Sequence, residues 1–493
     1  MTIILAIDAG TTGVRTLAVD VNGDVLSSSY KEFTQYFPEP GWVEHDAEEI
    51  WNSVQSTMAD VVATLSQPVA AIGITNQRET VVVWDRDTSL PLYKALVWQD
   101  RRTASRCAEL ENEGLLPTVR ESTGLILDPY FSASKFEWIL NNIPTEKNIA
   151  LGTIDSWLVW KLTGGKVHAT DASNASRTML LNINALEWDK ELLGVFGISE
   201  SCLPEIRASN GDYGSTSNDA SCGSGIPIRG IAGDQQASLF GHAAFSIGDA
   251  KNTYGTGSFV LMNVGQEPPE PVDGLLSTVA WLLETTNSST PTYALEGSIF
   301  STGSAVQWLR DGMDIISEAS ELENLALGCT STGDVHFIPA FTGLGSPWWD
   351  PHARGLLIGI TRGTGRAEIA RAVIESMVFQ TRDVIDAMQL ASRHKVQNLR
   401  VDGGASVMNL LLQMQADQLQ VPVLRSRSKE VTALGVAYLA GLSVGIWDSL
   451  TDISNNWSLD VKVFPEKEKT ICDADHSRWL QAVERSRNWA DSQ

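Results

Sequence analysis

The chain has 493 residues, about three times a typical domain length, which predicts two large domains or three smaller ones. Its formal charge of −24 argues against nucleic acid and anionic membranes as partners, because like charges repel at long range. A hydrophobic content of 43% with 19% charged residues is ordinary for a soluble enzyme. Any anionic ligand must therefore be held locally, by backbone N–H groups, helix N-termini or a divalent cation.

Several sequence signals concern location and cofactor class. The five cysteines form no CxxC pair, which indicates free thiols in a reducing compartment, and no His-Cys cluster has zinc spacing. No segment reaches the roughly 18 uninterrupted apolar residues of a membrane span, and the first apolar run is too short for a signal peptide. Neither GxxxxGK[ST] nor a GxGxxG after a strand occurs, which excludes a Walker-type NTPase. We expect a cytoplasmic protein without a membrane span.

Residues 3–7 and 14–21 predict two strands joined by a Gly-Thr-rich turn, which together form a hairpin. Such a turn exposes backbone N–H groups and two hydroxyls, so it can wrap a phosphate. An Arg after the turn suits a phosphate oxygen, and an Asp before it suits a hard cation such as Mg²⁺. An ordinary hairpin is the alternative, although two threonines between glycines are unusual in one. The side chains concerned are Asp8, Thr11, Thr12 and Arg15.

Residues 70–74 and 81–84 predict a second pair of strands, with the polar bridge 75–80 between them. Hydrogen-bonding side chains at the tip of two buried strands are costly unless they bind a ligand or one another. Arg78 beside Glu79 offers the donor and acceptor that vicinal hydroxyls require. A polar network that only closes the loop is the alternative.

The next segments add aromatic side chains and one helix. Trp98 and Tyr130 could cover the apolar face of a carbon chain, or could belong to the core. Residues 154–162 have helical spacing that ends before a Gly-Gly pair. Residues 168–177 are short and polar, and predict a loop without chemistry of its own.

At the centre of the chain, residues 226–231 predict a buried strand, Gly233 a tight turn and residues 235–240 the start of a helix. Asp234 is therefore placed at a strand-to-helix junction, where open α/β sheets bind ligands. An N-cap alone would account for a lone Asp. The Gly-Thr turns and the Arg-Glu pair nevertheless favour a catalytic or binding carboxylate.

The second half repeats the first hairpin, because residues 252–261 again predict strand, Gly-Thr turn and strand. Two duplicated domains would each bring one phosphate-binding hairpin to a shared cleft. Residues 303–310 and 368–388 predict helices. Residues 399–405 predict a strand entering a Gly-Gly turn, which would let the backbone approach a flat ligand such as adenine.

Ten segments carry a family resemblance along nearly the whole chain: residues 40–46, 73–80, 98–103, 174–180, 232–236, 252–257, 307–311, 349–355, 361–364 and 401–404. They resemble the FGGY carbohydrate kinase family. The resemblance implies an α/β fold of two actin-like (ribonuclease-H-like) domains with an active-site cleft between them. We expect these domains at residues 1–243, which bind the substrate, and 244–493, which bind the nucleotide.

The resemblance also implies ATP-dependent phosphorylation of glycerol to sn-glycerol 3-phosphate, with Mg²⁺ and with Asp234 as general base. It implies a homo-oligomer, dimer or tetramer, with glycerol or a similar polyol and ATP as ligands. The implied substrate contacts are Arg78, Glu79, Trp98, Tyr130, Asp234, Gln235 and Phe259. The implied nucleotide contacts are Thr11, Thr12, Gly13, Arg15, Thr256, Gly303, Gln307, Gly404 and Met408, and the implied metal ligands are Asp8 and Asp234.

Three positions depart from the family pattern. Gly13 replaces a frequent Ser, which removes a hydroxyl from the first turn but keeps its N–H. Met408 replaces a typical Asn near the adenine and bears on base selectivity. Gly225 stands where enterobacterial-type enzymes carry an Arg of a fructose-1,6-bisphosphate site, so we expect that form of feedback control to be missing.

Other functions stay open at this point. A kinase for erythritol, glyceraldehyde or dihydroxyacetone is the nearest alternative, because one methylene changes discrimination by only about 1–3 kcal/mol. A non-catalytic actin-like nucleotide-binding protein would keep the phosphate turns but has no reason to keep Arg78, Glu79 and Asp234 together. A degenerate kinase acting as a sensor is supported only by Met408.

Overall fold

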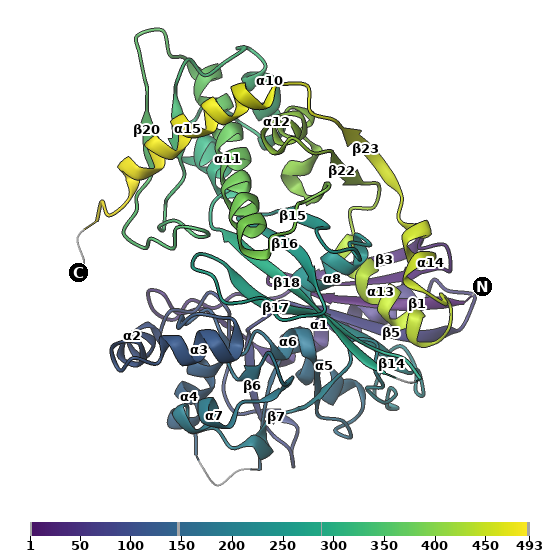
Figure 1. Ribbon diagram of the computed structural model, residues 1–493. Coiled ribbons are helices and arrows are strands. Elements are labelled where there is room, and N and C mark those ends of the chain that lie inside the picture. Colours follow the sequence, from purple (N-terminus) through teal and green to yellow (C-terminus); the bar gives the residue numbers. More distant parts are fainter. Residues whose placement is uncertain (1, 145–147, 287, 491–493) are drawn as a thin grey trace.

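Two related β-sheets organise the structure, a computed structural model that describes residues 2–144, 148–286 and 288–490 (Figure 1). The first sheet has the strand order β14-β5-β1-β2-β3 and the second the order β17-β18-β16-β15-β21-β22-β23. The first comprises β1 (Ile3–Ala9), β2 (Gly13–Val19), β3 (Val25–Glu32), β5 (Val69–Asn76) and β14 (Ile228–Gly233). The second comprises β15 (Ala250–Tyr254), β16 (Ser258–Gly265), β17 (Leu276–Glu284), β18 (Ser289–Ile299), β21 (Leu399–Gly403), β22 (Val423–Ser426) and β23 (Leu459–Val463).

The two sheets repeat one pairing pattern. In the first, β1 pairs antiparallel with β2 and parallel with β5, which pairs parallel with β14. In the second, β15 pairs antiparallel with β16 and parallel with β21, which pairs parallel with β22. A Gly-Thr turn joins the antiparallel pair in each sheet, at residues 10–12 and 255–257. The predicted fold class, with two related α/β halves, is confirmed.

Three helices pack on the first sheet, and one of them also contacts the second. Helix α1 (Ala47–Val62) packs on β2 and β3, while α8 (Asp234–Gly241) packs against α13 (Val431–Ser443). Although α13 comes from the second half of the chain, it lies on β1, β5 and β14. The approach is close, because a Cβ at Gly73 would lie 2.3 Å from the Val436 carbonyl oxygen. The domain boundary at 243/244 stays a prediction, because α13 lies after that boundary in the chain and yet covers the first sheet.

A third group of elements lies in the chain between β3 and β14 of the first sheet. The strands β4 (Glu44–His45), β6 (Val81–Asp85), β7 (Leu90–Pro91), β8 (Ala95–Leu96) and β9 (Ile149–Thr153) form one sheet. Two short pairs are β10 (Ala169–Asp171) with β13 (Glu205–Arg207) and β11 (Leu181–Asn182) with β12 (Glu187–Trp188). The helices here are α2 (Ala104–Asn112), α3 (Leu116–Thr123), α4 (Ser132–Asn142), α5 (Ile154–Leu162), α6 (Ala172–Ala175) and α7 (Lys190–Val195).

Two sequence predictions need correction in this region. The strands predicted at 70–74 and 81–84 both form, but β5 and β6 belong to different sheets. Both edges of β5 are already occupied by β1 and β14, so β6 finds its partners elsewhere. The segment 168–177, predicted as a loop, contains β10 and α6. Its strand depends on a distant partner, β13, and its helix is capped by the buried Asp171.

Two helices predicted in the second half of the chain are confirmed. Residues 368–388 lie within α11 (Arg366–Ser392), and residues 303–310 start as α9 (Gly303–Gln307) and continue as a π-helical turn. All five cysteines are free thiols, and none of the described helices is long and apolar enough to cross a membrane. The other elements are α10 (Leu322–Ala326), β19 (His336–Ile338), β20 (Leu356–Ile358), α12 (Asn409–Leu419), α14 (Leu450–Asn456) and α15 (Lys469–Ser486).

Candidate active site

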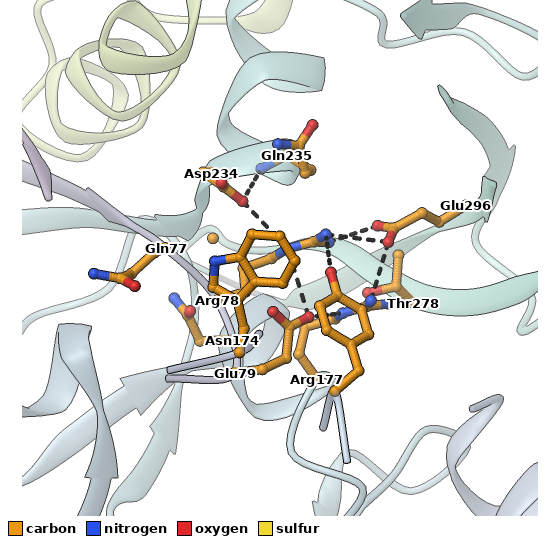
Figure 2. Close-up of polar contacts among 12 residues, drawn as sticks. Gln77, Arg78, Glu79, Asn174, Arg177, Asp234, Gln235, Thr278 and Glu296 are labelled. Carbon is orange, nitrogen blue, oxygen red and sulfur yellow. Dashed lines mark hydrogen bonds and ion pairs between the residues drawn. The ribbon is translucent and has the colours of Figure 1, made fainter. Parts of the chain in front are cut away.

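Asp234 is the first residue of α8, directly after β14, as predicted (Figure 2). Gly233 holds the N-cap position, and Asp234 therefore does not act as the helix cap. One carboxylate oxygen of Asp234, Oδ1, accepts a hydrogen bond from the Gln235 backbone N–H at 2.7 Å and lies 3.2 Å from Arg78 Nε. Its side chain is 32% exposed. The carboxylate is thus oriented by Arg78 and still accessible to a ligand.

A buried cluster of two arginines and two glutamates lies beside Asp234 (Figure 2). The Arg78 guanidinium donates two hydrogen bonds to Glu296, at 2.5 and 3.1 Å. Arg177 donates to Glu296 at 3.0 Å and, through Nε, to Glu79 at 2.7 Å. All four side chains are at most 2% exposed. Buried charges are tolerated when they are paired and hydrogen-bonded, and here two positive charges balance two negative ones.

The pKa values of the two glutamates shift in opposite directions in this environment. Burial alone would raise the pKa of Glu296, but Arg177 and Arg78 lower it to about 2. For Glu79, burial outweighs the two arginines and raises the pKa. Glu79 also adopts an unusual backbone conformation for a residue with a side chain, with φ of 60°. The cluster therefore holds Glu79 in a fixed place at the end of the polar bridge that leaves β5.

Arg177 and Glu296 were not predicted from the sequence as site residues. Glu296 stands between apolar neighbours in strand β18, and a lone acid in a buried strand requires a partner. That signal could have identified it. Arg177 gave no comparable signal, because it follows a short polar segment that was predicted to be a loop.

Aromatic side chains surround Arg78. The Tyr130 hydroxyl accepts a hydrogen bond from Arg78 Nη2 at 3.3 Å, and the Trp98 ring lies edge-on to Tyr130 at 5.6 Å between centroids. The Phe259 ring lies 5.8 Å from Arg78 Cζ. The structure thus brings together the predicted substrate residues on both sides of Asp234, with hydrogen-bonding groups next to apolar ring faces. Gln235 is the exception, since it is buried and its side-chain oxygen accepts from Lys251.

The first Gly-Thr turn lies next to these residues. The Trp98 indole Nε1 donates to Thr11 Oγ1 at 3.0 Å, which links the turn to the aromatic group. Thr12 is exposed, whereas Gly13 is buried, and a Cβ at Gly13 would lie 2.7 Å from the Lys31 carbonyl oxygen. A serine at this position would therefore require β3 to move. Arg15 forms an ion pair with Glu430, the residue before α13.

Asp8 lies at the end of β1, before the turn. Burial, followed by repulsion from Asp234 and Glu430, raises the pKa of Asp8 to about 7. In the described parts of the chain, no group of three or more His, Cys, Asp or Glu side chains could hold a metal ion. Mg²⁺ commonly uses only one or two protein carboxylates and takes its other ligands from phosphates and water. Asp8 and Asp234, which repel one another, fit that donor set.

The second Gly-Thr turn is joined to the start of α9. Gly303 N donates to the Gly255 carbonyl at 3.0 Å, and Thr302 N and Ser304 N both donate to the Thr256 carbonyl at 3.0 Å. The predicted nucleotide residues on this side differ in exposure: Thr256, Gln307 and Gly404 are exposed, while Met408 is buried in the apolar core around the second sheet.

Replacing Gly303 by Ala should weaken the nucleotide binding that the resemblance implies for this turn by about 10- to 100-fold, because the added methyl group would displace the turn that the helix start holds. A Cβ at Gly303 would lie 2.5 Å from the Gly255 carbonyl oxygen. Steady-state kinetics with varied ATP would measure the effect. Gly194→Ala is the matched control, since a Cβ there meets nothing within 4 Å. Unchanged ATP kinetics in Gly303→Ala would show that this turn does not contact the nucleotide.

Two family models match the chain over most of its length. The N-terminal domain of the FGGY family of carbohydrate kinases matches residues 3–241, and the C-terminal domain of that family matches residues 250–444. Glycerol kinase 2 of Thermotoga maritima is 51% identical over 498 residues, covering 99% of both chains. Glycerol kinase of Bacillus cytotoxicus is 50% identical over 492 residues, covering 98% of both.

Solved structures agree with these matches. The crystal structure of Plasmodium falciparum glycerol kinase with ADP has a TM-score of 0.94 at 36% identity, covering 99% of this chain and 98% of that one. A ligand-bound xylulose kinase from Lactobacillus acidophilus has a TM-score of 0.87 at 22% identity over 99% of this chain and 97% of that one, which supports the fold alone. Both family models and the full-length relatives lead to one conclusion. The chain belongs to the FGGY family of carbohydrate kinases.

Proposed function

We propose that this protein transfers the γ-phosphoryl group of ATP to glycerol and forms sn-glycerol 3-phosphate and ADP. One structural observation carries the proposal: Asp234 presents a partly exposed carboxylate, oriented by Arg78, beside a polar and aromatic group suited to a small polyol. The glycerol kinases that are about half identical over nearly the whole chain support glycerol as that polyol.

The proposed reaction is a direct in-line transfer. Asp234 accepts the proton of a terminal glycerol hydroxyl while that oxygen attacks the γ-phosphorus of ATP. The new P–O bond forms as the bond to the β–γ bridging oxygen breaks, and ADP leaves with that oxygen. Arg78 Nε, 3.2 Å from Asp234 Oδ1, keeps the carboxylate oriented toward the hydroxyl. Such transfers depend mainly on positioning and on neutralising charge.

Glycerol would be held by both kinds of side chain in this group. Although both side chains are at most 2% exposed, Arg78 would donate to the hydroxyls and Glu79 would accept from them, while Trp98 and Phe259 would cover the C–H face. Because Arg78 and Glu79 are already bound to Glu296 and Arg177, they are held rigidly before any ligand arrives.

ATP would bind with its phosphates between the two Gly-Thr turns, at Thr11, Thr12, Gly13 and Thr256. Arg15 would turn from Glu430 to a phosphate oxygen, and the adenine would lie near Gly404 and Met408, with Gly303 and Gln307 beside the nucleotide. Asp8 and Asp234 would hold Mg²⁺, which when bound neutralises phosphate charge. The hydrogen bond from Trp98 to Thr11 supports the assignment of the first turn, and the repulsion between the two aspartates supports that of the metal ligands, while the assignments in the second half rest on the family resemblance.

ADP formation by the purified protein should depend on both glycerol and Mg²⁺. A coupled ADP assay with a panel of glycerol, erythritol, glyceraldehyde and dihydroxyacetone would measure kcat/KM for each, and glycerol should give the highest value. A higher value for another member of the panel would transfer the proposal to that substrate. Tight ATP binding without polyol-dependent ADP formation would instead favour a non-catalytic nucleotide-binding protein or a sensor.

We also propose a division of the chain into two domains at 243/244. The spans matched by the two family models, residues 3–241 and 250–444, support it. The homo-oligomer and the cytoplasmic location stay predictions from the sequence, as does the missing bisphosphate control at Gly225.

A further inference from the structure

Lys251 is a buried cation that the proposed reaction does not use. It lies on β15, fully shielded from solvent. Its ammonium donates to Gln235 Oε1 at 2.5 Å and to Thr253 Oγ1 at 2.9 Å. Among the described residues, no carboxylate forms an ion pair with it. A buried ammonium is expensive unless its charge is compensated, so this position calls for a functional reason.

The compensating charge comes from Asp402, near the end of β21. Its Oδ2 atom accepts hydrogen bonds from Ser238 Oγ and from His242 Nε2, both at 3.0 Å. Its other oxygen, Oδ1, is buried without a hydrogen-bond partner among the described residues. Burial lowers the pKa of Lys251 to about 8, and the charges of Asp402 and Asp234 oppose that shift. Lys251 therefore lies within the electrostatic field of both carboxylates.

Lys251, Asp402 and their hydrogen-bond partners form a second buried cluster, which joins three elements. Its members are Gln235, Ser238, His242, Lys251, Thr253 and Asp402. Gln235 and Ser238 on α8 and His242 at its C-cap are spaced i, i+3 and i+7, which places them on one side of the helix. Lys251 and Thr253 share one face of β15. Thr253 is the register partner of Asp402 on β21. One face of α8 is therefore bonded to two adjacent strands of the second sheet.

Each of these elements leads into a different part of the proposed site. Helix α8 begins with Asp234, the proposed base. Strand β15 runs into the second Gly-Thr turn, and β21 runs into the turn that contains Gly404. The second buried cluster thus connects Asp234, beside the proposed glycerol site, with both proposed nucleotide turns of the second half.

We infer that Lys251 is a positioning residue for phosphoryl transfer. It holds Gln235 and the first turn of α8, and with them Asp234, at a fixed position relative to the strands that lead into the nucleotide turns. The inference rests on the proposed function, because it takes Asp234 as the base. Asp402 supports Lys251 from β21 and anchors the same helix through Ser238 and His242.

Lys251→Met keeps an unbranched side chain that is one atom shorter, and removes the charge and the donors. We expect kcat to fall by about 10- to 100-fold, while KM for ATP changes by less than about threefold, because misplacement of the base slows chemistry more than it weakens nucleotide binding. Adding an alkylammonium ion to Lys251→Ala should restore part of kcat, since the ion replaces the missing ammonium. Loss of stability alone would produce neither this split nor this rescue.

Two further variants keep the test decisive if the lysine variants do not fold. Asp402→Asn should lower kcat in the same way. Asp383→Asn is the matched control, because Asp383 on α11 is also a buried aspartate that accepts from a histidine, His476 of α15, at 2.6 Å, and has no contact with Lys251 or Asp402 among the described hydrogen bonds. That control should lower the thermal midpoint and leave kcat within about twofold of wild type.

The outcomes separate this inference from the proposed function. Active wild-type enzyme with unchanged kcat in Lys251→Met and Asp402→Asn would overturn the positioning role and leave the proposed function intact. An equal loss of kcat in Asp383→Asn, without rescue of Lys251→Ala by alkylammonium, would also overturn it, because the effect would be general destabilisation. Wild-type protein without glycerol-dependent ADP formation would overturn both.

Discussion

Replacing Asp234 by Asn is expected to lower kcat by about 10²- to 10⁴-fold, the usual range for loss of a general base. The amide is nearly the same size as the carboxylate, and its oxygen can still accept from the Gln235 N–H and from Arg78. It cannot take the proton of a glycerol hydroxyl. The binding of glycerol, and of ATP without Mg²⁺, should therefore change little, and a coupled ADP assay together with titration calorimetry would measure the rate and the two affinities.

The outcome of this experiment assigns the role of Asp234. Asp212→Asn is a suitable control, because this carboxylate is 69% exposed, pairs with Arg229 and lies outside the candidate site. An Asp234→Asn variant that binds both ligands normally and retains a rate within about tenfold of wild type would remove Asp234 from the role of base. A variant that binds neither ligand would instead show that the carboxylate shapes the site.

Glu296→Gln is expected to destabilise the folded protein by about 3–5 kcal/mol, because it leaves Arg78 and Arg177 buried with an uncompensated positive charge. Activity should fall as well, since Arg78 orients Asp234 and would lose both of its hydrogen bonds to an ionised partner. The thermal midpoint, measured by calorimetry, and kcat would report the two effects. Asp334→Asn is the control: it breaks an ion pair with Arg478 in which both side chains are about half exposed, and should change stability by less than about 1 kcal/mol.

The difference in stability between wild type and Glu296→Gln should depend on pH in a defined way. The pKa of Glu296 lies at about 2 in the folded protein and at 4.5 in its ordinary range, so between these values the unfolded chain binds more protons than the folded one. The stability that Glu296 contributes is therefore fully present above pH 4.5 and lost as the pH falls toward 2. The difference between wild type and Glu296→Gln should narrow on acidification from pH 5 to pH 3, approximately as linkage requires. A constant difference, or one equal to that of Asp334→Asn, would contradict a cooperative buried cluster.

Local patterns in the sequence were enough to predict the parts of the site that depend on nearby residues. Both Gly-Thr hairpins, the Gly-Gly turn that contains Gly404 and the position of Asp234 between β14 and α8 follow from strand alternation, glycine placement and a helix start, all of which act over a few residues. The repeated hairpin also indicated the two related halves, which the matching strand orders confirm.

The partners of these residues were decided only by the tertiary structure. Glu296 reaches Arg177 across 119 positions of the chain and Arg78 across 218, and the strands on either side of the polar bridge separate into two sheets. Helix α13 likewise returns from the second half to cover the first sheet. Such pairings follow from balancing buried charge and filling sheet edges and apolar faces. These requirements apply to the whole folded chain and leave no periodic signal in any one segment.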